Sequence, residues 1–390
     1  MSGVEGAVSA IRVKSCQIVP SLEARHGGPS KSVVGLSKAL ARIGDKVELF
    51  TTDPGPGWER SEGGLQIRAF HRSWPRSICP STFLRSHLRT IDADVVHHHS
   101  IWLRTLHYAH QTARKLGVPF VVSPRGMMDP WAWRHHSRKK ALARAIIHPG
   151  AFEAVDGWHV TSQDEAEAVR SLGFRQPSCV APNGVSAPSS KQTEEAAAHW
   201  ANLVPAAKQR PVALFYSRFH RKKRLIELID CWLEFAPEEW LLLVVGIPED
   251  YTPQMIDNYV LRSGNASRVR AYDGAGHPPP YAIASLFLLP SHGENFGLSI
   301  AESLAHGVPA LVTDTTPWSG LNRTGAGWCV PWPEFGSALR DATTEGADSL
   351  RHRGNVARAW VLREYSWDQS AKILSEFYAG LRPNTGARHP

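Results

Sequence analysis

The chain has 390 residues, and because a single hydrophobic core rarely grows beyond about 250–300 residues, we expect two domains of ordinary size. A formal net charge of +8 predicts an anionic partner, and nucleic acid, anionic lipid and phosphorylated small molecules all satisfy that charge. The five cysteines are widely spaced and include no C-x-x-C pair, which argues against a disulfide framework and a zinc site and fits a reducing compartment.

The N-terminus shows no targeting signal. Residues 1–10 are small and polar, without the basic and apolar regions of a signal peptide. No segment approaches about 18 uninterrupted apolar residues, the length that a membrane-spanning helix needs. We therefore expect a cytoplasmic protein.

Short β-branched segments alternate with helical segments along the chain. The predicted strands are residues 11–20, 47–52, 118–123, 212–217, 241–246, 285–290 and 308–313. This alternation predicts an α/β fold with parallel sheets covered by helices on both faces. An Ala-, Ser-, Glu- and Lys-rich stretch separates two such series, so we predict a first domain at 1–190, a linker at 191–209 and a second domain at 210–365.

A glycine-rich turn follows the first predicted strand. It contains Gly27 and Gly28 and leads into a helix predicted at residues 33–43. Ligands of open parallel sheets bind beyond the carboxyl ends of the strands, so this turn is suited to contact an anion or a sugar. Its spacing is neither that of a P-loop nor G-x-G-x-x-G, and a purely steric role for the glycines stays open.

Three consecutive histidines end the strand that follows. Side chains alternate faces along a strand, so His97 and His99 share a face and the three cannot all bind one metal ion. We expect no metal site, and one histidine, His99, lining a cleft between the domains. Arg125 and Asp129 follow the next strand and are candidates for the same cleft.

A basic segment with two tryptophans spans residues 131–147. This composition is typical of a helix lying on anionic lipid headgroups. An ordinary surface helix whose Leu142, Ile146 and Ile147 face the core is the alternative, and both interpretations stay open.

Basic residues also follow the first strand of the second domain. Arg218 and Lys223 precede a helix predicted at residues 225–235. A guanidinium and an ammonium near a helix N-terminus favour a pyrophosphate site, with about 1.5–3 kcal/mol for each charge-assisted hydrogen bond. A solvated basic loop is the alternative, and five basic residues within seven positions predict that some are surface charge.

Two glutamates flank a tight turn after the strand at 285–290. Glu294 precedes the turn and Glu302 lies in the helix that the turn opens. Gly297 allows close approach of the backbone to a ligand, and the helix N-terminus favours an anion. Ser299 and Glu302 also match a capping box, which needs no ligand.

Together these residues resemble glycosyltransferase family 4, the retaining nucleotide-sugar transferases of the GT-B fold, in which two Rossmann-like domains face a central cleft. The resemblance covers nearly the whole chain. Its motifs are Gly27-Gly28-Pro29, Ser123-Pro124-Arg125-Gly126-Met127, Pro182-Asn183-Gly184-Val185, Arg218 with Lys223, and Glu294-x7-Glu302. The segment from Trp131 to Lys140 resembles the branch that builds bacterial exopolysaccharide and lipopolysaccharide.

The resemblance implies a role for each matching residue. Arg218 and Lys223 would hold the donor diphosphate, Glu302 the ribose hydroxyls and Glu294 the transferred sugar. Backbone N–H groups of Asn295, Phe296, Gly297 and Leu298 would add donor contacts, as would the Gly27-Gly28 loop from the first domain. It also implies that the C-terminal segment, residues 366–390, starts as a helix that returns to the first domain.

The sequence departs from the family pattern in two places. Relatives usually have glycine where this chain has Ser217 and Arg224, so the basic loop would be stiffer and more charged. Many relatives have a histidine where this chain has Arg125, and His99 is the candidate to replace it.

The resemblance predicts transfer of a sugar from a nucleoside diphosphate without a metal ion or other cofactor. It favours same-face substitution over a double displacement through Glu294. A phosphorylase-like or hydrolytic relative, and a basic nucleic-acid-binding protein, are the alternatives. The second lacks support because aromatic residues do not interleave with basic ones. Donor base, sugar, acceptor and oligomeric state are not indicated.

Overall fold

The computed structural model describes residues 12–23, 28–129, 133 and 137–382 of the chain. The chain divides into two compact units. Unit 1 comprises residues 1–184 and 367–390, and unit 2 is the continuous segment 185–366. Each unit has its own sheet and core.

Unit 1 contains an eight-stranded sheet in the order β3-β4-β2-β1-β5-β6-β7-β8. Its neighbouring strands are parallel except for β3 and β4. The strands are β1 (Lys14–Ile18), β2 (Lys46–Asp53), β3 (Trp58–Glu62), β4 (Leu65–His71), β5 (Val95–His99), β6 (Phe120–Ser123), β7 (Gly157–Val160) and β8 (Ser178–Val180). The strand order reverses between β1 and β5, and in open parallel sheets the carboxyl edge at such a reversal is the usual place for a ligand.

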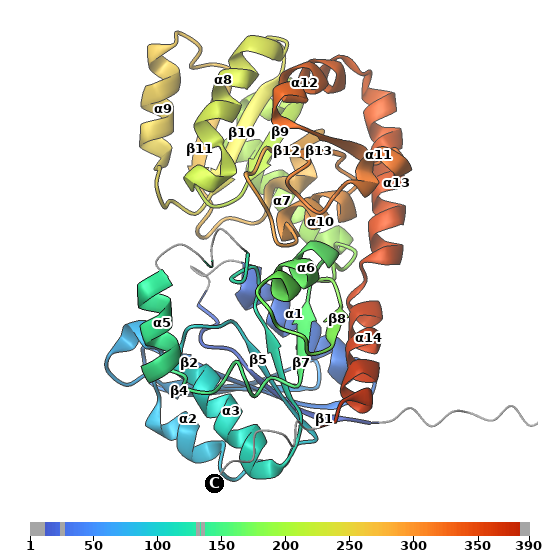
Figure 1. The fold of residues 1–390 in the computed structure, drawn as a ribbon. Helices are drawn as coiled ribbons and strands as arrows, with labels where there is room; N and C mark the ends of the chain where they lie inside the picture. Colours follow the sequence, from blue (N-terminus) through green and yellow to red (C-terminus); the bar gives the residue numbers. More distant parts are fainter. Residues whose placement is uncertain (1–11, 24–27, 130–132, 134–136, 383–390) are drawn as a thin grey trace, which may run out of the picture. The chain divides into compact units, whose positions relative to one another are not determined.

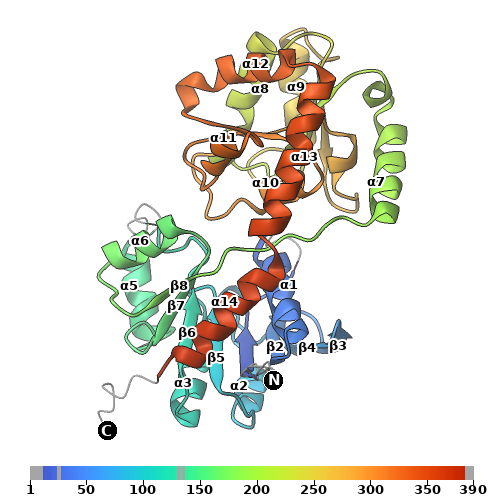
Figure 2. The same cartoon turned by 90° about the vertical axis from the view of Figure 1, so that its right-hand side faces the viewer.

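Helices cover both faces of this sheet (Figure 1). They are α1 (Gly28–Arg42), α2 (Thr82–His87), α3 (Arg104–Leu116), α5 (Ser137–Ile146), α6 (Gln163–Ser171) and α14 (Trp367–Gly380). Although α14 comes from the end of the chain, it packs beside α1, as Figure 2 shows. Arg42 and Asp368 join the two helices at 2.6 Å, and Ala371, Leu374 and Tyr378 complete the core on this face.

Unit 2 contains a six-stranded, fully parallel sheet in the order β11-β10-β9-β12-β13-β14. The strands are β9 (Val212–Tyr216), β10 (Leu241–Gly246), β11 (Val269–Asp273), β12 (Leu286–Leu289), β13 (Ala310–Thr313) and β14 (Gly327–Val330). The helices are α7 (Ser190–Leu203), α8 (Leu225–Phe235), α9 (Pro253–Arg262), α10 (Leu298–Ala305), α11 (Gly320–Thr324), α12 (Phe335–Thr344) and α13 (Ala347–Glu364). The order reverses between β9 and β12.

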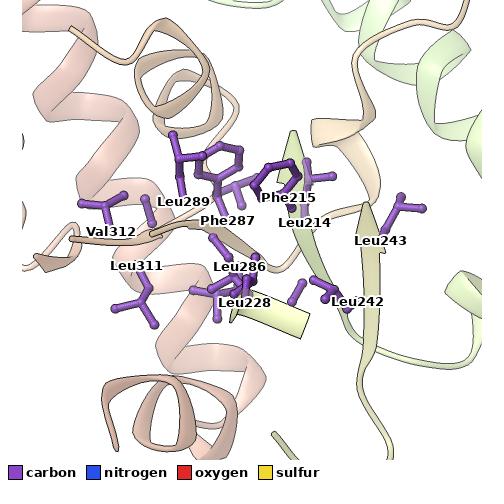
Figure 3. Close-up of a cluster of buried hydrophobic side chains, with 14 of the residues drawn as sticks. Leu214, Phe215, Leu228, Leu242, Leu243, Leu286, Phe287, Leu289, Leu311 and Val312 are labelled. Carbon is purple, nitrogen blue, oxygen red and sulfur yellow. The ribbon is translucent and has the colours of Figure 1, made fainter. Parts of the chain in front are cut away.

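Aliphatic and aromatic side chains fill the core of unit 2 (Figure 3). Every residue of β10 and β12 is buried, because a parallel sheet covered on both faces shields both sides of each strand. The strand at 241–246 therefore matches its predicted bounds, whereas the strand predicted at 11–20 shortens to β1.

The predicted linker at 191–209 was wrong. Most of it forms α7, whose N-cap Ser189 accepts a hydrogen bond from the N–H of Gln192 at 3.2 Å. Trp200 is fully buried in the core of unit 2 and donates to the carbonyl of Pro278 at 2.8 Å. The boundary lies instead at residues 184 and 185, and again at 366 and 367.

No helix in the described part of the chain is long and apolar enough to cross a membrane.

Candidate functional site

The topology of unit 2 brings two loops of interest together. The strand order reverses between β9 and β12, and the loops after these adjacent strands lie at the carboxyl edge of the sheet, where open parallel sheets usually bind ligands. The first loop carries Arg218 and Lys223, and the second carries Glu294. Residues far apart in the sequence therefore share one edge of unit 2.

Lys223 and Glu294 form the centre of this site. The ammonium of Lys223 donates to Oε1 of Glu294. The two side chains are only 9% and 11% exposed, so solvent screens the pair weakly. Lys223 retains further N–H donors for an anionic ligand, since an ammonium has three.

Hydrogen bonds tie the two loops together behind this pair. The carbonyl of Lys222 accepts from the N–H of His292 at 2.8 Å and from the hydroxyl of Ser291 at 3.2 Å. Thr313, the last residue of β13, and Thr315, just after it, donate to the carbonyl of Ser291 at 2.7 and 2.6 Å. These bonds fix the backbone that leads into Glu294, so its carboxylate is held in place before any ligand arrives.

Arg218 does not join the Lys223–Glu294 pair. Its Nη1 atom donates to both carboxylate oxygens of Glu249, at 2.9 and 3.1 Å. Glu249 lies in the loop after β10, and the two side chains are 45% and 40% exposed. Such exposed pairs contribute about 0–1 kcal/mol, so a stronger anion can displace Glu249.

The N-terminus of α10 opens beside Glu294. Gly297 is its N-cap with φ of 80°, and no side chain caps the helix. A Cβ atom at Gly297 would lie 2.8 Å from Ile300, so both the backbone angle and the packing require glycine. The N–H groups of Leu298 and Ser299 suit an anion, whereas that of Ile300 donates to the carbonyl of Gly297 at 2.9 Å, and the first turn contains no acidic residue.

The rest of this turn is structural. Phe296 is buried, and its carbonyl accepts from the indole of Trp318. Asn295 precedes it, so the backbone of 295–298 runs from the glutamate to the helix. Ser299 is the second residue of α10 and not its N-cap, so the capping-box interpretation of Ser299 and Glu302 was wrong.

Glu302 is held by a buried tyrosine. The hydroxyl of Tyr281 donates to Oε2 of Glu302 at 2.9 Å. Burial, together with the charge of Glu302, raises the pKa of Tyr281 well above its ordinary value, so the phenol stays protonated and remains a donor. This hydrogen bond holds one oxygen of the Glu302 carboxylate in a fixed orientation.

The two departures from the family pattern have different structural settings. The backbone of Ser217 approaches Gly246 so closely that a Cβ atom on Gly246 would lie 1.6 Å from the carbonyl oxygen of Ser217. Arg224 adopts a left-handed backbone with φ of 50°, the conformation that glycine adopts most easily. Its guanidinium lies over the ring of Trp332 at 4.8 Å and contacts His292 at 2.9 Å.

In unit 1 the histidines of β5 are all buried. His97 and His99 lie on one face with His159 of β7, while His98 lies on the other and bonds to Ser100 and Thr105. Burial lowers the pKa of His97 and His99 well below the ordinary value, and the pKa values of His98 and His159 to about 3. All four are therefore neutral at physiological pH.

Neutral histidines make this cluster a hydrogen-bond chain with one direction. His159 donates from Nε2 to a carbonyl at 3.0 Å, so its Nδ1 accepts from Ser123 at 2.7 Å. Applying the same rule to each partner gives the order of donation Arg125, His99, Gln17, Tyr378, His97, Ser123, His159 and the carbonyl of Ala181.

This chain of hydrogen bonds bears on whether the buried histidines bind a metal ion. Nitrogen atoms of His97, His99 and His159 lie within 4.8 Å of one another, close enough for a shared ion. Each of their ring nitrogens already has a hydrogen-bond partner, and the guanidinium of Arg125 contacts His99 at 3.0 Å. These ring nitrogens are therefore better suited to the hydrogen-bond network than to a metal ion, which would place a second positive charge beside Arg125.

Of the residues predicted for the cleft, the structure brings only two into direct contact. Arg125 donates to His99, while Asp129 is exposed in the turn four residues later. Gly28 is the first residue of α1, which begins five residues before the predicted start at 33. Gly27 lies outside the described residues.

Several residues of both sites were not predicted. Gln17, His159 and Tyr378 in unit 1, and Glu249 and Tyr281 in unit 2, all act through contacts distant in sequence. The only available signal was a polar side chain within a buried segment, as in Gly157–Val160, because such groups need partners.

Part of the basic segment at 131–147 lies outside the described residues. Within α5, Leu142 and Ile146 are 60% and 63% exposed. The interpretation that placed Leu142, Ile146 and Ile147 in the core was therefore wrong for the first two, whereas Ile147 is half-buried. Lys140 lies over the ring of Trp102 at 5.5 Å, which anchors one end of the helix.

Comparison with known proteins agrees with this geometry. Residues 26–187 match the family model Glycosyltransferase Family 4, and residues 200–353 match Glycosyl transferases group 1. A D-inositol 3-phosphate glycosyltransferase of Nocardioides sp. is 26% identical over 405 residues, covering 91% of this chain and 86% of the relative.

Solved structures show the same fold. Anabaena Alr3699/HepE in complex with UDP and glucose has a TM-score of 0.72 at 15% identity, covering 95% of this chain and 100% of the other. WaaG, a glycosyltransferase involved in lipopolysaccharide biosynthesis, has a TM-score of 0.67 at 15% identity, covering 94% and 100%. With both parallel-sheet units and both family models in place, the chain belongs to the family 4 glycosyltransferases of the GT-B fold.

Proposed function

We propose that this enzyme transfers a hexosyl group from a UDP- or GDP-linked sugar to a hydroxyl group, with retention of anomeric configuration. The observation that carries the proposal is the buried Lys223–Glu294 pair beside an uncapped helix N-terminus. A cation, a carboxylate and free N–H donors at one edge match the phosphates and hydroxyls of a nucleotide sugar. The relative solved with UDP and glucose supports a uridine nucleotide.

Arg218, Lys223 and the N-terminus of α10 stabilise the leaving diphosphate. Charge develops on the phosphate as the bond to the anomeric carbon breaks, so fixed positive groups lower the barrier. Arg218 exchanges Glu249 for the phosphate, and the exposed pair it gives up is weak. These positive groups supply the counter-charge, and we propose a reaction that needs no metal ion.

Glu294 accepts hydrogen bonds from the transferred sugar, and Glu302 binds the ribose. Tyr281 holds one oxygen of Glu302 and leaves the carboxylate oriented for a diol. Glu294 is bound to Lys223, which makes it a poor nucleophile. We therefore favour same-face substitution, in which the leaving phosphate takes the proton of the acceptor hydroxyl.

The acceptor belongs to unit 1 in this proposal. A glycan, a lipid-linked sugar and a small molecule are the classes we consider, within bacterial polysaccharide or cell-envelope glycan synthesis. The names of relatives support this range, since one acts on D-inositol 3-phosphate and another is involved in lipopolysaccharide biosynthesis.

The test is donor turnover by purified variants. We expect Lys223→Ala and Glu294→Ala to lower the turnover number at least about 100-fold, as loss of transition-state donors does elsewhere. Arg221→Ala is the matched control, because this neighbouring side chain is 80% exposed. Near-normal turnover in either site variant, with the fold intact, contradicts the assignment.

Three further readouts separate the alternatives. Product formed only with water or inorganic phosphate indicates a hydrolase or phosphorylase. The anomeric configuration of the product, read by NMR, tests retention. Activity lost in a chelator and restored by a divalent cation overturns metal independence.

We also propose a cytoplasmic enzyme that contacts the inner face of an anionic membrane through α5. The exposed Leu142 and Ile146 support this contact, and all five cysteines are free. In cosedimentation with vesicles of increasing phosphatidylglycerol content, binding should rise with anionic lipid and fall in the double variant Leu142→Ser and Ile146→Ser. Binding that ignores lipid charge contradicts the proposal.

A further inference from the structure

Arg125 is a partly buried cation held in a fixed position. It follows β6 in a left-handed conformation with φ of 55°, and the next N–H group, of Gly126, donates to Glu165 at 2.6 Å. Its guanidinium donates to Asn183 at 2.8 Å and to His99 at 3.0 Å. A strained backbone and two side-chain contacts thus direct this charge to one place.

The partners of Arg125 carry no negative charge. Asn183 is an amide, and His99 is neutral because burial lowers its pKa. Glu165 is the nearest acidic influence, and its oxygens are engaged by the N–H groups of Gly126 and Thr161. Among the described residues, Arg125 forms no ion pair within 4.0 Å.

A buried charge without a counter-ion is costly. Burial lowers the pKa of Arg125 to about 10, which leaves the guanidinium charged at neutral pH. Its Nε atom is buried without a hydrogen-bond partner. Protein charges in such settings are normally paired, so a bound anion would relieve the cost.

The start of α1 adds positive potential at the same place. The hydroxyl of Ser32, in the second turn of α1, lies 3.5 Å from Nη1 of Arg125. The first turn of this 15-residue helix contains no acidic residue. A Cβ atom at Gly28 would meet nothing within 4 Å among the described residues, so the space beside this glycine is open there.

We propose that Arg125, with the first turn of α1, binds an anionic group of the acceptor, a carboxylate or a phosphate. A planar guanidinium binds either group through paired N–H donors, whereas a neutral hydroxyl would leave the charge uncompensated. The identification of the ligand as an acceptor rests on the proposed function, but the anion site itself does not. The substrate class is therefore an acidic sugar or a sugar phosphate.

The experiment compares ligands that differ only in charge. Glucose, glucuronate, glucose 6-phosphate and inorganic phosphate are titrated by calorimetry into the full chain and into Arg125→Gln. We expect an anionic probe to bind the wild type about tenfold more tightly than it binds Arg125→Gln, with glucose unaffected. Preference for glucuronate or for the phosphates distinguishes the two sources of the anion.

Two variants keep the outcome interpretable. Arg125→Lys preserves the charge and should retain part of the anion binding if Arg125→Gln does not fold. Arg170→Gln removes an exposed arginine of the same unit and should bind as the wild type does. Equal binding of every probe by wild type, Arg125→Gln and Arg125→Lys overturns the anion site.

Nucleotide binding separates this inference from the proposed function. UDP and GDP are expected to stabilise wild type and Arg125→Gln equally, because their site is in unit 2. If neither nucleotide binds the wild type, the proposed function fails while the anion site stands. If a nucleotide binds and no probe depends on Arg125, the anion site fails alone.

Discussion

Strands β5 of unit 1 and β10 of unit 2 are both buried along their whole length, yet their side chains differ sharply in chemistry. β5 reads Val-Val-His-His-His, and β10 reads Leu-Leu-Leu-Val-Val-Gly. Apolar side chains need only matching volume, whereas buried imidazoles need a partner for each nitrogen. Although both strands are equally buried, the stability of β10 therefore depends on packing, whereas that of β5 depends on proton binding.

Acidification should produce the largest difference in stability between the two units. The unfolded chain protonates histidine near pH 6.5, whereas burial lowers the pKa values of His98 and His159 to about 3 in the folded chain. Between these values the unfolded state binds more protons, so stability falls as pH falls. At pH 5 each such histidine lowers the free energy of unfolding of unit 1 by about 2 kcal/mol relative to neutral pH.

Hydrogen exchange read by mass spectrometry resolves the two units. Peptides containing β5 and β7 should lose protection at pH 5, after correction for intrinsic exchange rates, well before peptides containing β10 and β12. In unit 2 burial lowers the pKa values of His292 and His306, but neither side chain is fully buried, so this unit serves as a less acid-sensitive internal reference. Parallel loss in both units would show that the buried histidines do not govern acid sensitivity.

Leu242→Ala should have the next largest effect, and on unit 2. Leu242 is fully buried in β10 (Figure 3), and truncating such a leucine costs about 2–5 kcal/mol through lost burial and a residual cavity. Urea unfolding followed with the same peptides should show destabilisation confined to unit 2 and independent of pH between 5 and about 8. A change of less than about 1 kcal/mol contradicts the packing account.

Ser123→Ala should have the smallest of these effects, and on unit 1. Removing the hydroxyl leaves Nε2 of His97 and Nδ1 of His159 without the partner that bridges them at 2.8 and 2.7 Å. Each unsatisfied buried group costs about 1–3 kcal/mol, and because a water that takes the place of the hydroxyl would bond to both nitrogens, we expect a total loss of about 1–2 kcal/mol. Ser37→Ala is the control, since that buried hydroxyl has no hydrogen-bond partner, and an equal loss in both variants contradicts the bridging role.

The sequence predicted elements with long apolar runs better than elements with few buried residues. The strand at 241–246 and the helix at 225–235 match β10 and α8, because long apolar runs and a periodic apolar face are local signals. α7 was missed because Ala196 and Trp200 are its only buried residues. In the same way, α1 extends to Gly28 through small and polar residues that show no helical periodicity.

Prediction of the two candidate sites from the sequence was limited in the same way. Lys223 and Glu294 were predicted from short motifs, since each motif follows a strand and the strands meet at one edge. The partners of the neighbouring Glu302 and Arg218 could not be predicted, because Tyr281 and Glu249 come from other segments of unit 2. In unit 1 the hydrogen-bond chain needs Tyr378, which is 281 residues from His97.

That last contact affects the order in which the units form during synthesis. Unit 2 is one uninterrupted segment, so the whole of it can emerge from the ribosome and fold before translation finishes. Unit 1 must wait, because Tyr378 supplies the hydroxyl that donates to His97 and α14 supplies part of its core. A nascent chain that ends before residue 367 leaves an apolar groove and an incomplete polar chain in unit 1, and is exposed to aggregation during that interval.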